Sequence, residues 1–242
     1  MPSGSSNSSS DEQQKTQTFA FIAMTCLFFF WGFITVLNDI LIPFLKDSFD
    51  LNYTQAMLVQ FCFFGAYFII SPFAGKLIDK VGYQQGIVLG LLTTALGCFL
   101  FYPSADLHVY ELFLFAFFVL ASGITVLQVA ANPYVAALGP DKTAASRLNL
   151  AQAANSLGTT VGPLVGAALI LGVVAADASA VQGPYIMLGG LLVLAAIMFR
   201  FIKLPRISSV ESGETTSDEN KMTPEWRQRF EETWLELWKP QD

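Results

Sequence analysis

The chain has 242 residues, of which 53% are hydrophobic and only 13% are charged, and its formal net charge is −6. A soluble domain carries roughly twice this charged fraction, so the composition argues against a soluble protein. The acidic balance does not indicate a nucleic-acid partner. The apolar residues are gathered in uncharged blocks of about 20 residues, the length that a membrane-spanning helix needs.

Six such blocks follow one another along the chain and predict an all-α integral membrane domain over residues 19–204. The predicted spans are Phe19–Leu45, Gln55–Ala74, Gln84–Pro103, Leu112–Leu138, Leu148–Val174 and Pro184–Ile202. The Ser-rich residues 1–18 are predicted to be a disordered cytoplasmic N-terminus, because they offer little apolar surface to bury. Residues 205–242 are predicted to be a cytoplasmic tail with an amphipathic helix at 224–238, where aromatic residues recur every four positions.

The distribution of basic residues predicts the orientation. With the N-terminus in the cytoplasm, 12 of the 13 lysines and arginines fall on the inner side, and only Lys46 falls on the outer side. This asymmetry is a strong positive-inside signal. We therefore expect a multi-pass protein of the inner (plasma) membrane with both termini in the cytoplasm.

The spans form two sets of three, residues 19–103 and 112–202, which repeat one another. Ile34–Phe44 reads ITVLNDILIPF and Ile124–Tyr134 reads ITVLQVAANPY, so four identical residues, a carboxamide and a proline–aromatic pair recur 90 residues apart. Because each copy has an odd number of spans, the repeat is inverted. Inverted repeats place binding groups near the bilayer midplane. The alternative is that apolar helices resemble one another by composition alone.

Four motifs lie in or beside the spans: WGFITVLNDILIP (Trp31–Pro43), GKLIDKVGY (Gly75–Tyr83), QVAANPY (Gln128–Tyr134) and RLNLAQAANSLG (Arg147–Gly158). With these motifs the chain resembles the N-terminal half of a major facilitator superfamily transporter, in the fucose permease and glucose/galactose transporter family. The resemblance implies a fold of two six-span halves and a role in sugar transport. The chain ends about where a seventh span would begin. We therefore expect a C-terminal six-helix half, in the same or another chain, or a second copy, as its partner.

Asp39 is the only ionisable residue deep within a predicted span. A carboxylate at the centre of a membrane helix costs roughly 2.5–3.5 kcal/mol, so it usually faces a water-filled cavity and marks an ion path. The alternative is a position near the outer interface, because Asp39 lies late in a long first span. The resemblance implies that Asp39 carries a coupling proton, and sodium is as plausible. We expect no cofactor beyond a coupling H⁺ or Na⁺.

Carboxamides inside apolar spans are the candidate substrate-binding groups, because each can both donate to and accept from sugar hydroxyls. Gln152 and Asn155 lie three residues apart on one helical face, and the resemblance implies that both contact the sugar. Gln128 and its counterpart in the repeat, Asn38, join the set. Asn132, which precedes a proline, is predicted to serve either the sugar or the freed backbone. The alternative use of the carboxamide stripe is to bond one span to another.

Gln128 is also the position at which the chain departs from part of the family. Fucose-transporting members have a glutamate there, whereas the glucose/galactose members resemble this chain in having a glutamine. Glutamine cannot titrate, so we expect one ion-binding group and not two. Aromatic residues such as Trp31, Phe63, Phe64 and Tyr67 could stack on a sugar ring, but nothing in the sequence selects among them.

The predicted cytoplasmic loop after the second span resembles the gating signature of the superfamily. In this loop Gly75 would permit a close helix approach, and Asp79 and Lys80 would form switchable ion pairs between halves. Gly82 would permit a tight turn. The alternative is a loop that is basic only because it lies in the cytoplasm.

The fifth span carries Gly158, Gly162 and Gly166, four residues apart, a spacing that lets another helix approach closely. The resemblance places this span where the two halves of a transporter meet. If the chain is a natural half of a transporter, we therefore expect this glycine face to pair with another copy or with a separate C-terminal half.

The sequence as a whole predicts secondary active transport of a hexose of the glucose, galactose or fucose type, coupled to a cation or proton, by alternating access. The alternative is a half-bundle that assembles with or regulates a complete transporter without moving substrate. We expect no enzyme, because no nucleophile–base–acid set is present. We expect no metal site either, because His108 is the only histidine and the three cysteines are dispersed.

Overall fold

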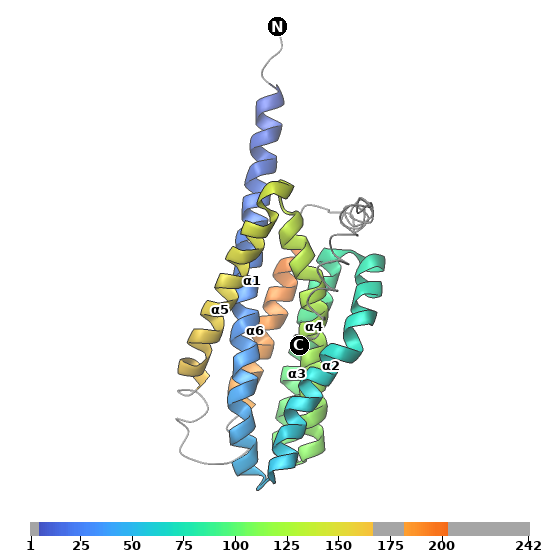
Figure 1. The fold of residues 1–242 in the computed structure, drawn as a ribbon, viewed down its shortest axis with the longest axis vertical. Coiled ribbons are helices and arrows are strands. Elements are labelled where there is room, and N and C mark those ends of the chain that lie inside the picture. The colour runs from blue at the N-terminus through green and yellow to red at the C-terminus, as the bar shows by residue number, and fades with distance from the viewer. Residues whose placement is uncertain (1–4, 167–181, 203–242) are drawn as a thin grey trace, which may run out of the picture. The chain divides into compact units, whose positions relative to one another are not determined.

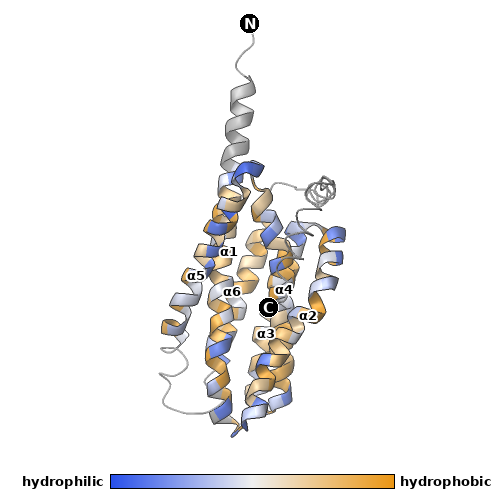
Figure 2. Cartoon of the chain, in the orientation of Figure 1, coloured by the Kyte–Doolittle hydropathy of each residue, from blue (hydrophilic) through white to orange (hydrophobic). Residues whose placement is uncertain are grey.

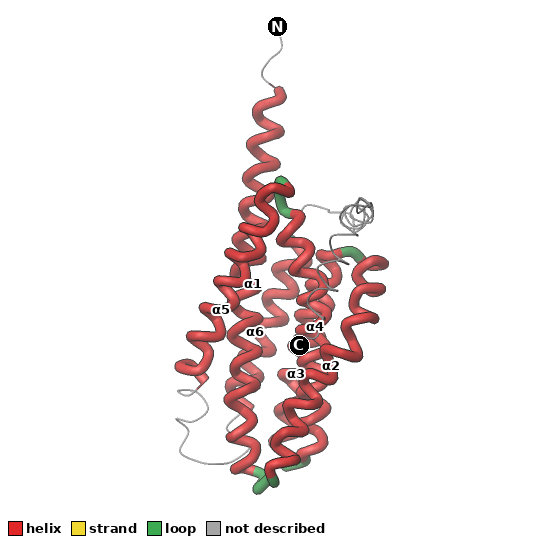
Figure 3. The backbone as a smooth tube through the Cα atoms, in the orientation of Figure 1, coloured by secondary structure: helices red, strands yellow, loops and turns green. Residues whose placement is uncertain are grey.

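The computed structural model describes residues 5–166 and 182–202, which form six α-helices and one short 3₁₀-helix (Figure 1). Within these ranges no strand is present (Figure 3). The helices are α1 (Ser5–Ser48), α2 (Tyr53–Val81), α3 (Tyr83–Asp106), α4 (Tyr110–Ala137), η1 (Asp141–Thr143), α5 (Ala144–Gly166) and α6 (Gln182–Phe201). Each predicted span coincides with one of these helices as far as the described residues extend.

Five of the helices are long and apolar enough to cross a membrane: α1, α2, α3, α4 and α6. The exception among the described helices is α5. Its first half carries Arg147, Asn149, Gln152 and Asn155, and these residues lower its mean hydropathy. The colouring in Figure 2 shows this difference, because α5 is paler and bluer along its length than α3, α4 or α6. The last residues of the fifth predicted span, and the tail helix predicted at 224–238, lie outside the described residues.

Short turns separate the consecutive helices from α1 to α5, and two of these turns have recognisable capping residues. Asn52 and Gln55 form a capping box at the start of α2, in which each side chain accepts a hydrogen bond from the other residue's backbone N–H. A single residue, Gly82, separates α2 from α3. Its φ is +82°, a backbone conformation that glycine adopts without steric cost. The tight turn predicted at Gly82 is therefore present.

The N-terminus differs from the prediction, because α1 begins at Ser5 and residues 5–18 continue the first helix. Disorder is expected for this stretch only when it is taken alone, because it has little apolar surface to bury. Joined to a stable transmembrane helix, its residues need only propagation of the existing helix, which avoids the cost of a new nucleus. Glu12, Gln13, Gln14 and Lys15 are also good helix formers.

The helices pack in a way that relates the two sets of three spans. Helix α1 lies along α5, and α4 lies along α2. The first helix of each set thus packs on the second helix of the other, as a two-fold relation between the sets requires. Helix α3 packs on both α4 and α6, whereas α1 and α6 touch only weakly, so the relation is broken at that one pair.

The glycine face of α5 is occupied by α1, which corrects the prediction that it packs against a partner half. A Cβ added at Gly158 would fall against the carbonyl oxygen of Phe29, and one added at Gly166 would come within 2.7 Å of Ile40 Cδ1. Gly32 supplies the complementary small residue on α1, against the backbone oxygen of Asn155. The spacing correctly indicated a close helix approach, but the neighbour lies within this chain.

Candidate functional site

Polar side chains of α1, α2, α4 and α5 lie along a closed circuit, in which hydrogen bonds join the helices and residues one turn apart connect the bonds along α4 and α5. The circuit runs from Trp31 on α1 to Tyr67 on α2, on to two carboxamides of α4, then to two carboxamides of α5, and back to Phe28 on α1. All the polar members are half-buried. Apolar helices can tolerate such groups only where protein or water satisfies them.

Tyr67 connects α1, α2 and α4. Gln128 Nε2 donates to the Tyr67 hydroxyl over 3.1 Å, and Trp31 hydrogen-bonds to the same hydroxyl. An indole can only donate, so the Tyr67 oxygen accepts from both neighbours. Its own proton is then available to donate to a third group.

Asn132 and Gln152 connect α4 to α5. Asn132 lies one turn beyond Gln128 on the same face of α4, and Gln152 Nε2 is 3.4 Å from Asn132 Oδ1. This distance is long for a hydrogen bond between amides. The two side chains are therefore neighbours that still have capacity to bind another partner.

Asn155 closes the circuit on α1. Its Nδ2 donates to the Phe28 carbonyl over 3.1 Å, and the Phe28 ring lies edge-on to Trp31, with 5.3 Å between ring centroids. The carboxamide of Asn155 therefore bonds α5 to α1. Bonding between spans was the alternative to sugar binding for these carboxamides. Among the hydrogen bonds of the described residues, this leaves Oδ1 as the Asn155 side-chain atom available to a ligand.

Asp39 lies outside the circuit, about 12 Å along α1 from Trp31 at 1.5 Å per residue. Its carboxylate is exposed and hydrogen-bonds with the side chain of Gln60 on α2. The carboxylate is therefore neither sealed in the core nor without a partner. It lies on a side of the α1–α2 pair that the described helices leave uncovered.

Asn38 is the one predicted substrate-binding residue that the structure separates from the others. It is 3% exposed and accepts a hydrogen bond from the Tyr185 hydroxyl of α6 over 3.2 Å. Its Nδ2 is buried and has no partner among the described residues. Successive helical residues point about 100° apart, so Asn38 faces Tyr185 of α6 while Asp39 points to a different side of α1, toward Gln60 of α2. We interpret Asn38 as a core residue that fixes the rotation of α1.

The predicted gating residues lie at the C-terminal end of α2. Asp79 and Lys80 are exposed in its last turn, where a partner half could reach them. A Cβ built at Gly75 would meet no atom of the described residues within 4 Å. The close approach predicted at Gly75 is therefore not made within this bundle.

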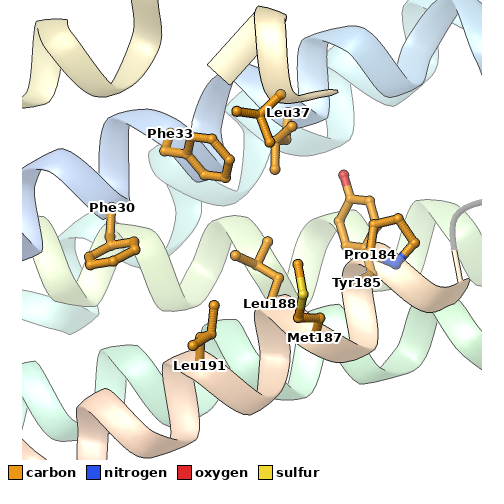
Figure 4. A pocket seen from close by; sticks show the side chains of 9 residues that line it. Phe30, Phe33, Leu37, Pro184, Tyr185, Met187, Leu188 and Leu191 are labelled. Carbon is orange, nitrogen blue, oxygen red and sulfur yellow. The ribbon is translucent and has the colours of Figure 1, made fainter. Parts of the chain in front are cut away.

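Two cavities lie between α1 and α6, where the two-fold relation of the helices is broken. Their volumes are about 170 and 190 Å³, and their linings are apolar. Figure 4 shows Phe30, Phe33 and Leu37 of α1 facing Leu188 and Leu191 of α6 across the first cavity. Apolar walls cannot satisfy sugar hydroxyls, and none of the polar circuit lines these cavities, so they are not the substrate site.

Sequence reasoning missed Gln60 and the hydrogen-bonding role of Tyr67. Gln60 is a carboxamide in an apolar span, so the criterion that selected Gln128 and Gln152 would have selected it too. Tyr67 was considered only as an aromatic surface. Its role depends on which residues of α1 and α4 lie beside it, and no local signal gives that.

Comparisons with known proteins agree on one family. The family model of the Major Facilitator Superfamily matches residues 20–241. A glucose/galactose transporter of Brucella abortus (strain 2308) is 55% identical over 221 residues, which cover 89% of this chain and 53% of that protein. The L-fucose-proton symporter of Escherichia coli (strain K12) is 36% identical over 217 residues, covering 81% of this chain and 50% of that protein.

A solved structure shows the same arrangement of helices. The crystal structure of the Major Facilitator Superfamily transporter FucP in the outward conformation superposes with a TM-score of 0.72 at 36% identity, covering 79% of this chain and 51% of that one. A point variant of the E. coli fucose:proton symporter gives a TM-score of 0.70 at 35% identity, covering 78% of this chain and 50% of that one. The chain spans about half the length of the curated relatives it matches.

Proposed function

The chain belongs to the Major Facilitator Superfamily, with α1–α6 forming the N-terminal half of that family's fold, and we propose that it carries one half of the substrate path of a secondary active sugar transporter. The named relatives are transporters and not enzymes. Within the chain, the observation that carries the proposal is the closed polar circuit across α1, α2, α4 and α5.

The circuit has the chemistry that a hexose needs. The oxygens Gln128 Oε1, Gln152 Oε1 and Asn155 Oδ1 can accept from sugar hydroxyls, while Asn132 Nδ2 and the Tyr67 proton can donate. An aromatic side chain, Trp31, lies beside them and offers a ring face. The substrate class is therefore a hexose of the glucose, galactose or fucose type, in keeping with the names of the relatives.

Asp39 and Gln60 supply the coupling site in this proposal. A proton or cation that binds Asp39 neutralises its charge and so changes the relative stability of the inward- and outward-open states. A proton is favoured, because one named relative is a proton symporter, and Na⁺ remains the competing ion to test. Alternating access then takes place between this half and a C-terminal six-helix half, in the inner membrane and with both termini in the cytoplasm.

Equilibrium binding tests the substrate site. The chain is produced with the C-terminal half of the B. abortus transporter in lipid nanodiscs, and the dissociation constants for D-glucose, D-galactose and L-fucose are measured. Gln152→Ala and Asn155→Ala should each weaken binding about 3- to 10-fold, the effect of losing one hydrogen bond of about 1 kcal/mol. Gln85→Ala, at an exposed carboxamide of α3, is the control. Unchanged affinity of both variants for all three sugars would remove these residues from the site.

A further inference from the structure

Helices α4 and α5 each carry half of the carboxamides of the circuit, yet they share little direct packing. Helix α5 packs mainly on α1, and α4 packs mainly on α2 and α3. A broad interface therefore does not set the distance between Asn132 and Gln152. Individual contacts between the two helices must set it.

The strongest of these contacts is made by Arg147 in the first turns of α5. Its Nε donates to the Val135 carbonyl over 3.2 Å, and one terminal nitrogen donates to the carbonyls of Ala136 and of Gly139, the latter over 3.2 Å. The other terminal nitrogen donates to the Pro140 carbonyl over 3.1 Å and to the Thr143 hydroxyl over 2.6 Å. One guanidinium thus binds the end of α4, the connecting turn and η1.

These bonds add partners to carbonyls at the C-terminal end of α4. The last four carbonyls of an α-helix lack the regular partner within the helix. Helix α4 ends at Ala137, and the N–H of its C-cap residue Leu138 donates to the Val135 carbonyl over 3.3 Å. Val135 and Ala136 belong to this last turn. Arg147 therefore acts as the C-terminal cap of one helix while it belongs to the next, so the two helix ends cannot separate without breaking several charge-assisted hydrogen bonds.

We propose that Arg147 is a positioning residue that fixes the spacing of α4 and α5, and so holds Asn132 and Gln152 at the separation that one sugar requires. The part of this inference that concerns sugar binding rests on the proposed function, whereas the part that concerns helix spacing does not. The planar fork of the guanidinium is essential, because several donors must point in fixed directions at once. A lysine keeps the positive charge but lacks that geometry.

Disulfide cross-linking measures the spacing without any sugar. Asn132→Cys and Gln152→Cys are combined in a chain whose three native cysteines are replaced by serine, and the rate of cross-linking is followed under mild oxidation. Arg147→Gln and Arg147→Lys should both slow this rate about tenfold or more, because misplaced groups lose effective molarity steeply. Arg200→Lys and Arg200→Gln, at an exposed arginine in the last turn of α6, are the matched controls and should leave the rate unchanged.

Sugar binding is the second readout, with the carboxamides intact. Arg147→Lys should raise the dissociation constant of the preferred sugar about tenfold, with the same yield of folded helical protein. The inference is overturned if cross-linking is unaffected, if Arg147→Lys behaves as wild type, if the Arg200 controls slow cross-linking equally, or if cross-linking slows while affinity is unchanged. A wild-type chain that binds no sugar contradicts the proposed function instead, and the cross-linking rates still decide the spacing.

Discussion

At the scale of single residues, the hydroxyl of Tyr67 is the group whose chemistry is most narrowly defined by its neighbours. Gln128 and Trp31 both donate to its oxygen. An oxygen that accepts twice directs its own proton away from both donors. In the proposed site this proton is a donor for a sugar hydroxyl, and the two neighbours fix its direction.

Tyr67→Phe should therefore weaken sugar binding about 2- to 10-fold, the range expected for one hydrogen bond worth about 0.5–1.5 kcal/mol. Isothermal titration of the purified protein with the preferred sugar measures this. Tyr53→Phe removes an equally simple hydroxyl from the exposed first turn of the same helix and should have no effect. Equal affinities for wild type and Tyr67→Phe would mean that the hydroxyl does not reach the substrate.

Gln84 shows how a single polar side chain can stabilise the end of a neighbouring helix. The Gln84 amide donates to the carbonyls of Phe199 and Ile202, both over 2.9 Å, and so satisfies the C-terminal end of α6. Tyr83 is buried beside Tyr134, with 6.2 Å between ring centroids. Both residues therefore make contacts within this bundle.

At the scale of the helices, the α1–α5 pair depends on an absence of side chains. Gly32 and Gly158 each lie where an added Cβ would meet backbone atoms of the facing helix, at Asn155 and Phe29 respectively. Backbone atoms cannot move aside as a flexible side chain can. The hydrogen bond from Asn155 to Phe28 spans the same contact, so the closeness of the two helices also sets one corner of the polar circuit.

Gly158→Ala should lower the stability of the protein by about 1–3 kcal/mol, the usual cost of overpacking, and should weaken sugar binding in the same preparation. Thermal unfolding in detergent, followed by tryptophan fluorescence, measures the first effect. Gly190→Ala on α6 is the matched control, because a Cβ there meets nothing within 4 Å and alanine favours the helix more than glycine does. A melting temperature for Gly158→Ala equal to that of Gly190→Ala would contradict the close packing of α1 against α5.

The helices were predictable from sequence, and their rotations were not. Long uncharged blocks define spans by length alone, so the approximate limits of the five apolar helices among the described residues could be derived. A span that is apolar on all sides has no polar stripe to fix which face turns inward. Asn38 and Asp39 are adjacent and equally conspicuous in sequence, yet one bonds to Tyr185 in the core and the other is exposed. The glycines of α5 likewise predicted a close approach but not its partner.

At the scale of the whole molecule, the chain presents large apolar side chains that its own described helices do not cover. Phe61, Phe68 and Phe73 of α2 are 72%, 84% and 63% exposed, and Leu164 of α5 is 73% exposed. Exposed apolar patches of this size mark surfaces that lipid or another protein segment covers. The carboxamides of the proposed site are only half-buried by the described helices, and in the proposed function a facing C-terminal half would enclose them.

In the proposed function, coupling requires both halves, and Asp39 is the residue on which it depends. Co-expressed with the C-terminal half and reconstituted in liposomes, the wild-type chain should accumulate sugar when a pH gradient is imposed. Asp39→Asn keeps the size of the side chain and can still hydrogen-bond to Gln60. A neutral carboxamide cannot take up a proton or balance the charge of a bound cation. The substitution should abolish accumulation and retain exchange of labelled for unlabelled sugar, because exchange needs alternating access without net ion movement.

The comparison of accumulation with exchange separates a lost ion site from a damaged protein, since unfolding would abolish both. Asp106→Asn, at the exposed C-terminal end of α3, should retain both activities. Imposing a Na⁺ gradient at constant pH in parallel identifies the coupling ion, because only the gradient of the true ion drives accumulation in the wild type. If Asp39→Asn still concentrates sugar under either gradient, the ion binds elsewhere and the carboxylate beside Gln60 has no part in coupling.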